Sequence, residues 1–285
     1  MGVRLAGPLL AILLMQMFLV QSADRAAPDG ITRTVYVTVT DDDGAAVTGL
    51  TAADFAVKEG GKARDIVKAE PAKIRMRTAV MIDERLLGDG PTRSGIFEFM
   101  KRLQPASEFA LITVGLRNQT VVDYTSQLET IVTAINKFTL NPGTVSNFNE
   151  SVLDVTRQLT EQRAPRPVIV VVAIPGEAAS TAFVSEALNS LRQSGAQLHA
   201  VMLARGTGGS GQVLDDGAKQ SGGRRLDVNV STAIPKALQQ VADDLSAQYS
   251  LSYVLPNGVK PDRRVSVDVT RKGVRLRAPN ALPDR

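Results

Sequence analysis

The strongest constraint on the fold of this 285-residue chain is a set of short, continuous apolar runs. The most apolar run contains Val168-Ile169-Val170-Val171-Val172, and similar runs occupy residues 78–82, 109–114 and 197–203. These runs lack the alternation of polar and apolar residues that marks a strand with one face in water. They are typical of strands buried on both faces, as in parallel sheets covered by helices.

Segments with helical spacing lie between these runs. Residues 92–103 place Ile96, Met100 and Leu103 on one face. Strands that alternate with helices require right-handed crossovers and a mostly parallel sheet. The sequence therefore predicts a doubly wound, Rossmann-like α/β domain over residues 77–247. Further helices are expected near residues 126–138, 151–159, 181–194, 213–220 and 233–248.

The stretch before this domain has a β pattern. Residues 34–40 alternate with period two and are mostly β-branched, and Asp41-Asp42-Asp43-Gly44 follows as a turn. The three acidic residues could also hold calcium, but the turn explains them. A second turn at Gly60-Gly61 precedes a short strand at residues 63–69. Residues 32–76 are therefore expected to form a separate β module.

The tail of the chain returns to the β pattern. Residues 249–255 alternate, and residues 264–270 and 274–278 are predicted to form a hairpin around Arg271-Lys272-Gly273. Neither end of the chain can bury a core alone. We therefore expect the strands of residues 248–279 to pack on the N-terminal strands in one small β-sandwich-like module.

The first 22 residues have the features of a secretory signal peptide. Arg4 precedes an apolar run over residues 5–20, and small residues follow at Ser22 and Ala23. A spanning helix needs roughly 20 apolar residues, and this run is shorter and interrupted. We expect cleavage after Ser22 and export to the periplasm or the medium, with no membrane span in the mature chain. An uncleaved N-terminal anchor is the alternative.

Composition excludes several classes of function. The chain has no cysteine, which excludes disulfides, thiolate zinc sites and a catalytic thiol. Its net charge is a mild +4, and its Lys and Arg residues are scattered. Binding of nucleic acid requires a denser basic stripe, so nucleic acid is not expected as a partner.

Three loop motifs give the sequence a family resemblance. A buried strand ends in Ile82-Asp83, a loop contains Pro142-Gly143-Thr144, and the most apolar strand ends in Ala173-Ile174-Pro175-Gly176-Glu177. Together they resemble the ligand loops of a von Willebrand factor A (vWA) domain. Asp54-Phe55-Ala56-Val57 and Gln248-Tyr249-Ser250-Leu251-Ser252-Tyr253 are similar to motifs of an exported bacterial vWA-related subgroup first noted in Acidobacteria.

The resemblance implies a metal-ion-dependent adhesion site (MIDAS), and the sequence departs from its pattern. The family takes oxygen ligands from Asp-x-Ser-x-Ser, from a Thr on the second loop and from an Asp on the third. Asp83 and Thr144 match, whereas the other positions hold Arg85, Leu87 and Pro175. A Mg²⁺ ion requires near-octahedral oxygen ligands at about 2.0–2.1 Å, and a fixed cation beside it is repelled. The sequence therefore predicts a degenerate MIDAS without metal, and no cofactor.

Arg85 leaves three hypotheses open. Its guanidinium could pair with Asp83 or Glu177 and fill the space of the ion. It could instead present a fork to a carboxylate of a protein partner. A relocated cation site could also use Asp83 and Thr144 together with Glu84 and Asp89. The predicted ligand-binding face consists of Asp83, Glu84, Arg85, Thr144 and Glu177.

Signals for catalysis are weak. Gly206-Thr207-Gly208-Gly209-Ser210-Gly211 matches a dinucleotide fingerprint but lies near the last strand–helix turn rather than the first. The single histidine, His199, is expected to be packed, and the sequence has no Gly-x-Ser-x-Gly elbow. We expect a non-enzymatic exported interaction module for adhesion or envelope assembly. The alternatives are a cation-dependent vWA protein, a nucleotide-using enzyme and a structural envelope component without a dedicated ligand.

Overall fold

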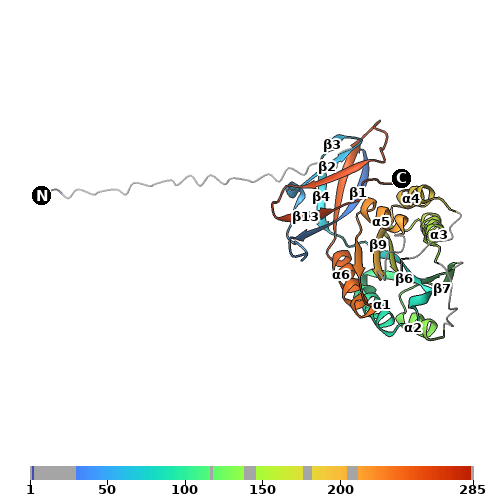
Figure 1. Ribbon diagram of the computed structural model, residues 1–285. Coiled ribbons are helices and arrows are strands. Elements are labelled where there is room, and N and C mark those ends of the chain that lie inside the picture. Colours follow the sequence, from blue (N-terminus) through green and yellow to red (C-terminus); the bar gives the residue numbers. More distant parts are fainter. Residues whose placement is uncertain are drawn as a thin grey trace.

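Two modules make up the computed structural model, which describes residue 2 and residues 30–115, 118–137, 146–175, 182–203 and 211–283. A larger α/β module carries one six-stranded sheet, and a smaller β module carries two antiparallel sheets (Figure 1). Apart from Gly2, the expected signal segment lies outside the described residues. No helix in the described ranges combines the length and the apolar character needed to cross a membrane.

The six-stranded sheet confirms the predicted α/β fold class. Its strands run in the order β10-β9-β8-β5-β6-β7, and all neighbours are parallel except β6 and β7. Every residue of β8 and β9 is buried. The continuous apolar run of β8 is typical of such a strand, whereas β9 also buries Gln197 and His199. The strands are β5 (Met76–Asp83), β6 (Ser107–Val114), β7 (Asn118–Thr125), β8 (Pro167–Ala173), β9 (Gln197–Leu203) and β10 (Arg225–Val228).

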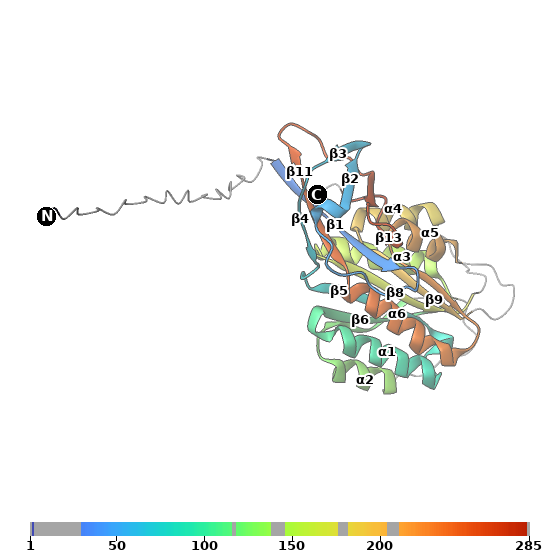
Figure 2. The same ribbon diagram turned by 90° about the vertical axis from the view of Figure 1, so that its left-hand side faces the viewer.

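Helices cover both faces of this sheet (Figure 2). Alternate residues of β8 point to opposite cores: Val170 packs with α1, α2 and α6, whereas Val171 packs with α3, α4 and α5. Burial of each such side chain stabilises the fold by about 1.5–3 kcal/mol. The helices are α1 (Gly90–Leu103), α2 (Leu128–Lys137), α3 (Phe148–Glu161), α4 (Val184–Ser194), α5 (Gln212–Gln220) and α6 (Ile234–Ser246).

The β module combines strands from both ends of the chain, as the sequence predicts. One sheet has the order β13-β1-β11-β4 and the other has the order β12-β2-β3. The N-terminal β1 pairs antiparallel with both β11 and β13, so neither end can form this sheet alone. The strands are β1 (Gly30–Asp41), β2 (Phe55–Glu59), β3 (Lys62–Arg64), β4 (Ile66–Pro71), β11 (Tyr249–Pro256), β12 (Val265–Val269) and β13 (Val274–Arg277).

Two local predictions for the β module are wrong. Strands β12 and β13 do not form a hairpin, because β12 pairs with β2 and β13 pairs with β1 in the opposite sheet. Residues 270–273 therefore cross between the sheets. The predicted single strand at residues 63–69 is two strands, β3 and β4, which separate at Asp65 and join different sheets. Distant partners decide three of these pairings, since β12 pairs with β2, β13 with β1 and β4 with β11.

Polar contacts join the two modules. Gln248, between α6 and β11, donates through Nε2 to Thr38 Oγ1 at 3.3 Å, and its backbone oxygen accepts from Ala72 N at 2.7 Å. Asp244 of α6 forms ion pairs with Arg224 at 2.9 Å and with Arg277 of β13 at 2.7 Å. Asp244 is only 4% exposed, so these pairs are shielded from water.

Candidate functional site

Asp83 is the last residue of the central strand β5, at the edge where the parallel strands end. Ligands of open α/β sheets bind at this edge. The side chain of Asp83 is fully buried. It caps the short 3₁₀ helix Glu84–Leu86 by accepting from Arg85 N at 3.0 Å, so the turn after β5 holds its carboxylate in place.

Arg85 forms a two-point ion pair with this carboxylate. Its Nε donates to Asp83 Oδ1 at 2.9 Å, and its Nη2 donates to Asp83 Oδ2 at 2.6 Å and to Ile174 O at 3.2 Å. The predicted pairing of Arg85 with Asp83 is confirmed. Hydrogen bonding to Asp83 raises the pKa of Arg85 above its ordinary value, with partial burial opposing. The guanidinium therefore stays charged at every physiological pH.

Ser146 completes the surroundings of the carboxylate. Its Oγ donates to Asp83 Oδ2 at 2.7 Å, and Ile174 N approaches the same oxygen at 3.4 Å. Sequence reasoning missed Ser146, which stands directly before Asn147, the N-cap residue of α3. A hydroxyl residue at the start of a helix on the second loop is the signal that could have identified it.

Of the other residues predicted for this site, two lie among the described residues and two lie outside them. Glu84 lies against Gly115 at the end of β6, where an added Cβ would be 2.6 Å from the Glu84 carboxylate. Asp89 caps α1 by accepting from Thr92 N at 2.9 Å and from Thr92 Oγ1 at 2.8 Å. Thr144 and Glu177 lie outside the described residues.

Comparison with known proteins identifies the fold. No family model matches the sequence, and no curated protein matches it. Among solved structures, the proximal thread matrix protein 1 of the mussel byssus, with a zinc-occupied MIDAS motif, superposes with a TM-score of 0.51 at 15% identity. The match covers 64% of this chain and 49% of that one. The α/β module has a vWA-like fold.

Other solved structures match the vWA-like domain with lower scores. The VWA domain of SpRpn10 has a TM-score of 0.43 at 10% identity, over 56% of this chain and 94% of that one. An aerotolerance-related membrane protein from Bacteroides fragilis has a TM-score of 0.45 at 16% identity, over 59% of this chain and 98% of that one. The chain spans about half the length of the mussel protein. Membership of the exported bacterial subgroup stays a prediction.

The residues at the MIDAS position of this vWA-like domain do not fit a divalent cation. Both oxygens of Asp83 already accept hydrogen bonds, and the Arg85 guanidinium places a positive charge against them. Leu87 is completely buried, and neither its side chain nor that of Pro175 contains an oxygen atom. In the described ranges, no three His, Cys, Asp or Glu side chains gather in a way that could hold a metal. A relocated site therefore has no support from the described residues.

Three further candidates from the sequence are His199, the acidic turn that begins at Asp41, and the Gly-rich loop. His199 is fully buried, its Nε2 lies 3.3 Å from Gln197 Oε1, and its Nδ1 has no partner among the described residues. Burial lowers the pKa of His199 to about 3, with Arg277 and Arg224 adding to the effect. Asp41 closes its predicted turn by accepting from Ala45 N at 2.8 Å. The Gly-rich loop, except Gly211, lies outside the described residues.

Two exposed apolar side chains stand on the same edge as Asp83. Phe183, at the N-cap of α4, is 76% exposed, and Val230, after β10, is 55% exposed. Both belong to connections that leave the carboxyl ends of strands in the sheet. Sequence reasoning missed them, because an isolated apolar residue in a loop has no periodicity to reveal its exposure.

Proposed function

We propose that this chain is a non-enzymatic, exported interaction module that binds a protein partner through the carboxyl-end face of its vWA-like domain, without a metal ion. Among the described residues, this face comprises Asp83, Glu84 and Arg85, extended by Phe183 and Val230; the sequence alone adds Thr144 and Glu177. The observation that carries the proposal is the two-point pairing of Arg85 with the buried Asp83. An arginine that belongs to the chain takes the place of the cation that the MIDAS pattern would hold.

The difference in exposure between the two side chains of this pair supports recognition of an acidic group on the partner. The Asp83 side chain is fully buried, whereas the side chain of Arg85 is 31% exposed. The face therefore offers a guanidinium to solvent and conceals the carboxylate. An arginine whose side chain is already ordered loses little entropy when it binds a carboxylate, and charge-assisted hydrogen bonds are stronger than neutral ones.

Apolar anchors supply the remaining part of a protein interface. Aromatic and aliphatic side chains at the centre of an interface carry most of the binding energy. Phe183 and Val230 are the exposed large apolar residues on this edge of the described sheet connections. Export, inferred from the signal features of residues 1–22, would place such a face in the envelope, where adhesion or scaffold assembly is the expected role.

The proposal is tested by a crosslinking pull-down with purified residues 23–285 and an envelope fraction from the host. We expect one dominant crosslinked partner, recovered equally in Mg²⁺ and in EDTA. Arg85→Gln and Val230→Ser should each reduce its recovery at least tenfold. The matched control is Val67→Ser on β4 of the β module, because Val67 is 48% exposed and Val230 is 55% exposed; this control should leave recovery unchanged.

Three outcomes would contradict the proposal. Loss of the partner in EDTA would show that recognition needs a divalent cation. Equal recovery with Arg85→Gln and Val230→Ser would remove the carboxyl-end face from the interaction. Recovery of many weak neighbours without a dominant partner would favour a structural component without a dedicated ligand. A thermal shift with NAD or a nucleotide would support the enzymatic alternative.

A further inference from the structure

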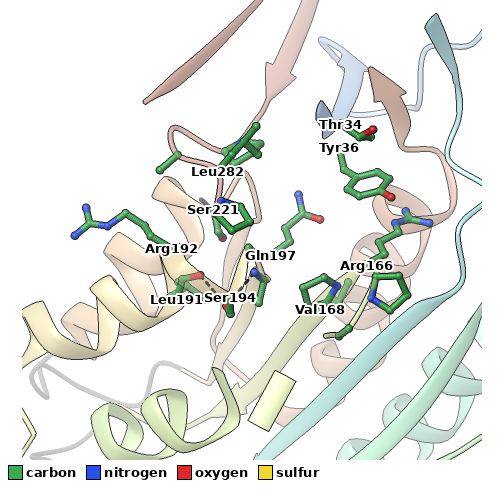
Figure 3. Close-up of a pocket in the computed structure, with 18 of the residues that line it drawn as sticks. Thr34, Tyr36, Arg166, Val168, Leu191, Arg192, Ser194, Gln197, Ser221 and Leu282 are labelled. Atoms are coloured by element: carbon green, nitrogen blue, oxygen red, sulfur yellow. Dashed lines mark hydrogen bonds between the residues drawn. The ribbon is translucent and has the colours of Figure 1, made fainter. Parts of the chain in front are cut away.

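A cavity of about 300 Å³ lies between the two modules, at the edge of the sheet opposite Asp83 (Figure 3). Its wall includes Pro167 and Gln197, the first residues of β8 and β9, together with Tyr36 of β1 and Leu282 near the end of the chain. A volume of this size is at the lower end of ligand sites. The vWA-like domain therefore closes one side of the cavity and the β module closes the other.

The charged side chains described in the cavity wall are all positive. Arg163, Arg166 and Arg192 line it, and no Asp or Glu does so among the described residues. A more open hollow of about 850 Å³ adjoins it through Arg192 and Ala281 and adds Arg263 and Arg264, again without an acidic residue in the described wall. Positive charge on low-dielectric walls concentrates anions.

Arg166 is the buried cation of this wall. It is 3% exposed, its Nη1 donates to Ile74 O at 3.2 Å, and its Nη2 donates to Leu245 O at 2.9 Å and to Gln248 Oε1 at 2.6 Å. Its Nε has no hydrogen-bond partner, and no carboxylate pairs with it in the described part of the chain. Its guanidinium lies 5.1 Å from the centre of the Tyr36 ring. A buried charge without a counter-charge is costly.

Burial does not neutralise this arginine. Desolvation lowers the pKa of Arg166 to about 10, with Tyr36 opposing the shift, so the guanidinium is still protonated at neutral pH. Figure 3 shows Tyr36 and Arg166 on one side of the cavity and Leu191 and Leu282 on the other. The cavity thus has a cationic side and an apolar side.

We propose that this cavity binds a small amphipathic anion, with a carboxylate or phosphate head beside Arg166 and Tyr36 and an apolar body against Leu191 and Leu282. The head would supply the counter-charge that Arg166 lacks. The adjoining hollow, with Arg192 at its border, leaves room for the far end of the ligand. This site lies at the amino ends of the strands and does not depend on the function proposed for the opposite face.

Calorimetric titration of residues 23–285 with octanoate, octyl phosphate and 1-octanol tests the proposal. We expect saturable 1:1 binding of octanoate or octyl phosphate, and the comparison of the two identifies the head group. Octanol, which has the same body without charge, should bind at least tenfold more weakly. Equal binding of octanol, or no binding of either anion, would overturn the proposal.

Two variants test separately the positive charge of the cavity wall and the open space beside it. Arg166→Met removes the buried cation, and Ala281→Phe fills the passage between the cavity and the hollow while it keeps every charge. Each should weaken binding of the anion at least tenfold, whereas Arg102→Gln on α1, away from this wall, should not change it. Unchanged binding of the anion in Ala281→Phe would overturn the assignment of the ligand to this cavity, even if Arg166→Met fails to fold. Binding that appears only after removal of Asp284 and Arg285 would favour an occupant from the chain itself.

Discussion

At the scale of single residues, the buried carboxylate of Asp83 depends on Arg85 for its counter-charge. Ser146 and the backbone of Ile174 add hydrogen bonds but no charge. Removal of one partner from a buried ion pair leaves an uncompensated charge, which costs about 3–5 kcal/mol when the pair is fully enclosed. Because Arg85 is partly exposed, water can replace part of its contribution.

We therefore predict that Arg85→Ala lowers the free energy of unfolding by about 2 kcal/mol. Urea denaturation at neutral pH measures the change. The double variant Asp83→Asn, Arg85→Ala should lose less than the sum of the two single variants, because the pair is one interaction. An Arg85→Ala variant as stable as the wild type would show that the pair contributes nothing to the fold.

His199 makes stability depend on pH. Its folded-state pKa is about 3, whereas an unfolded histidine titrates near 6.5. Between these values the unfolded chain binds a proton that the folded chain does not, so stability falls as pH falls below 6.5. We predict that this group lowers the free energy of unfolding by about 2 kcal/mol between pH 7 and pH 5. His199→Gln should remove that part of the pH dependence in urea titrations; an identical dependence in both proteins would contradict the prediction.

Pairing of Arg85 with Asp83 or Glu177 is one of three hypotheses that the sequence leaves open, and the structure shows the pair with Asp83. Ser146 was not predicted, since its contact with Asp83 depends on how the second loop reaches the sheet. No local pattern encodes that distance. Arg166 was also missed, because a lone arginine before an apolar strand looks like a solvated residue in sequence.

At the scale of elements, β9 is approached closely by the backbone of the segment that precedes β10. A Cβ added to Gly223 would lie 1.8 Å from Leu198 O. No side chain fits there, so the glycine is required by space. Glycine is the usual residue where another backbone comes this close.

Gly223→Ala is predicted to lower the free energy of unfolding by about 3 kcal/mol, because β10 must move away from β9. Thermal and urea denaturation measure the loss. Gly90→Ala at the start of α1 is the matched control, since an added Cβ there meets nothing within 4 Å and should be nearly neutral. Similar losses in both variants would show that the close approach is not the cause.

The apolar strands and their helices were predictable because their patterns are local. The strands are short apolar runs, and the helices repeat apolar residues with helical spacing. The sequence predicts a hairpin of β12 and β13 wrongly, because the pairing of short β strands is decided by distant partners. β12 finds β2, and β13 finds β1, each far away in sequence. Local turn residues such as Gly273 fit a hairpin and a crossing between sheets equally well.

At the scale of the whole molecule, Asp244 links the modules through Arg224 and Arg277. Asp244→Asn would remove the carboxylate that both of these partly exposed guanidinium groups pair with. We predict a loss of about 3 kcal/mol in the free energy of unfolding, with exchange of backbone hydrogens rising in β13 as well as in α6. A change confined to α6 would show that the modules are not coupled through this residue.

The joining of both chain ends in one β module follows from the sequence, because each end is too small to bury a core. The cavity beside Arg166 does not, since its wall is assembled from β1, the starts of β8 and β9, and the C-terminal segment. Such a site exists only once the modules are packed together.

Arg85, and not a divalent cation, provides the positive charge beside Asp83. Calorimetric titration of metal-free residues 23–285 with Mn²⁺ and then Mg²⁺ tests it most directly. We expect no saturable heat up to millimolar concentrations of either ion. Saturable 1:1 binding that Asp83→Asn abolishes would contradict it.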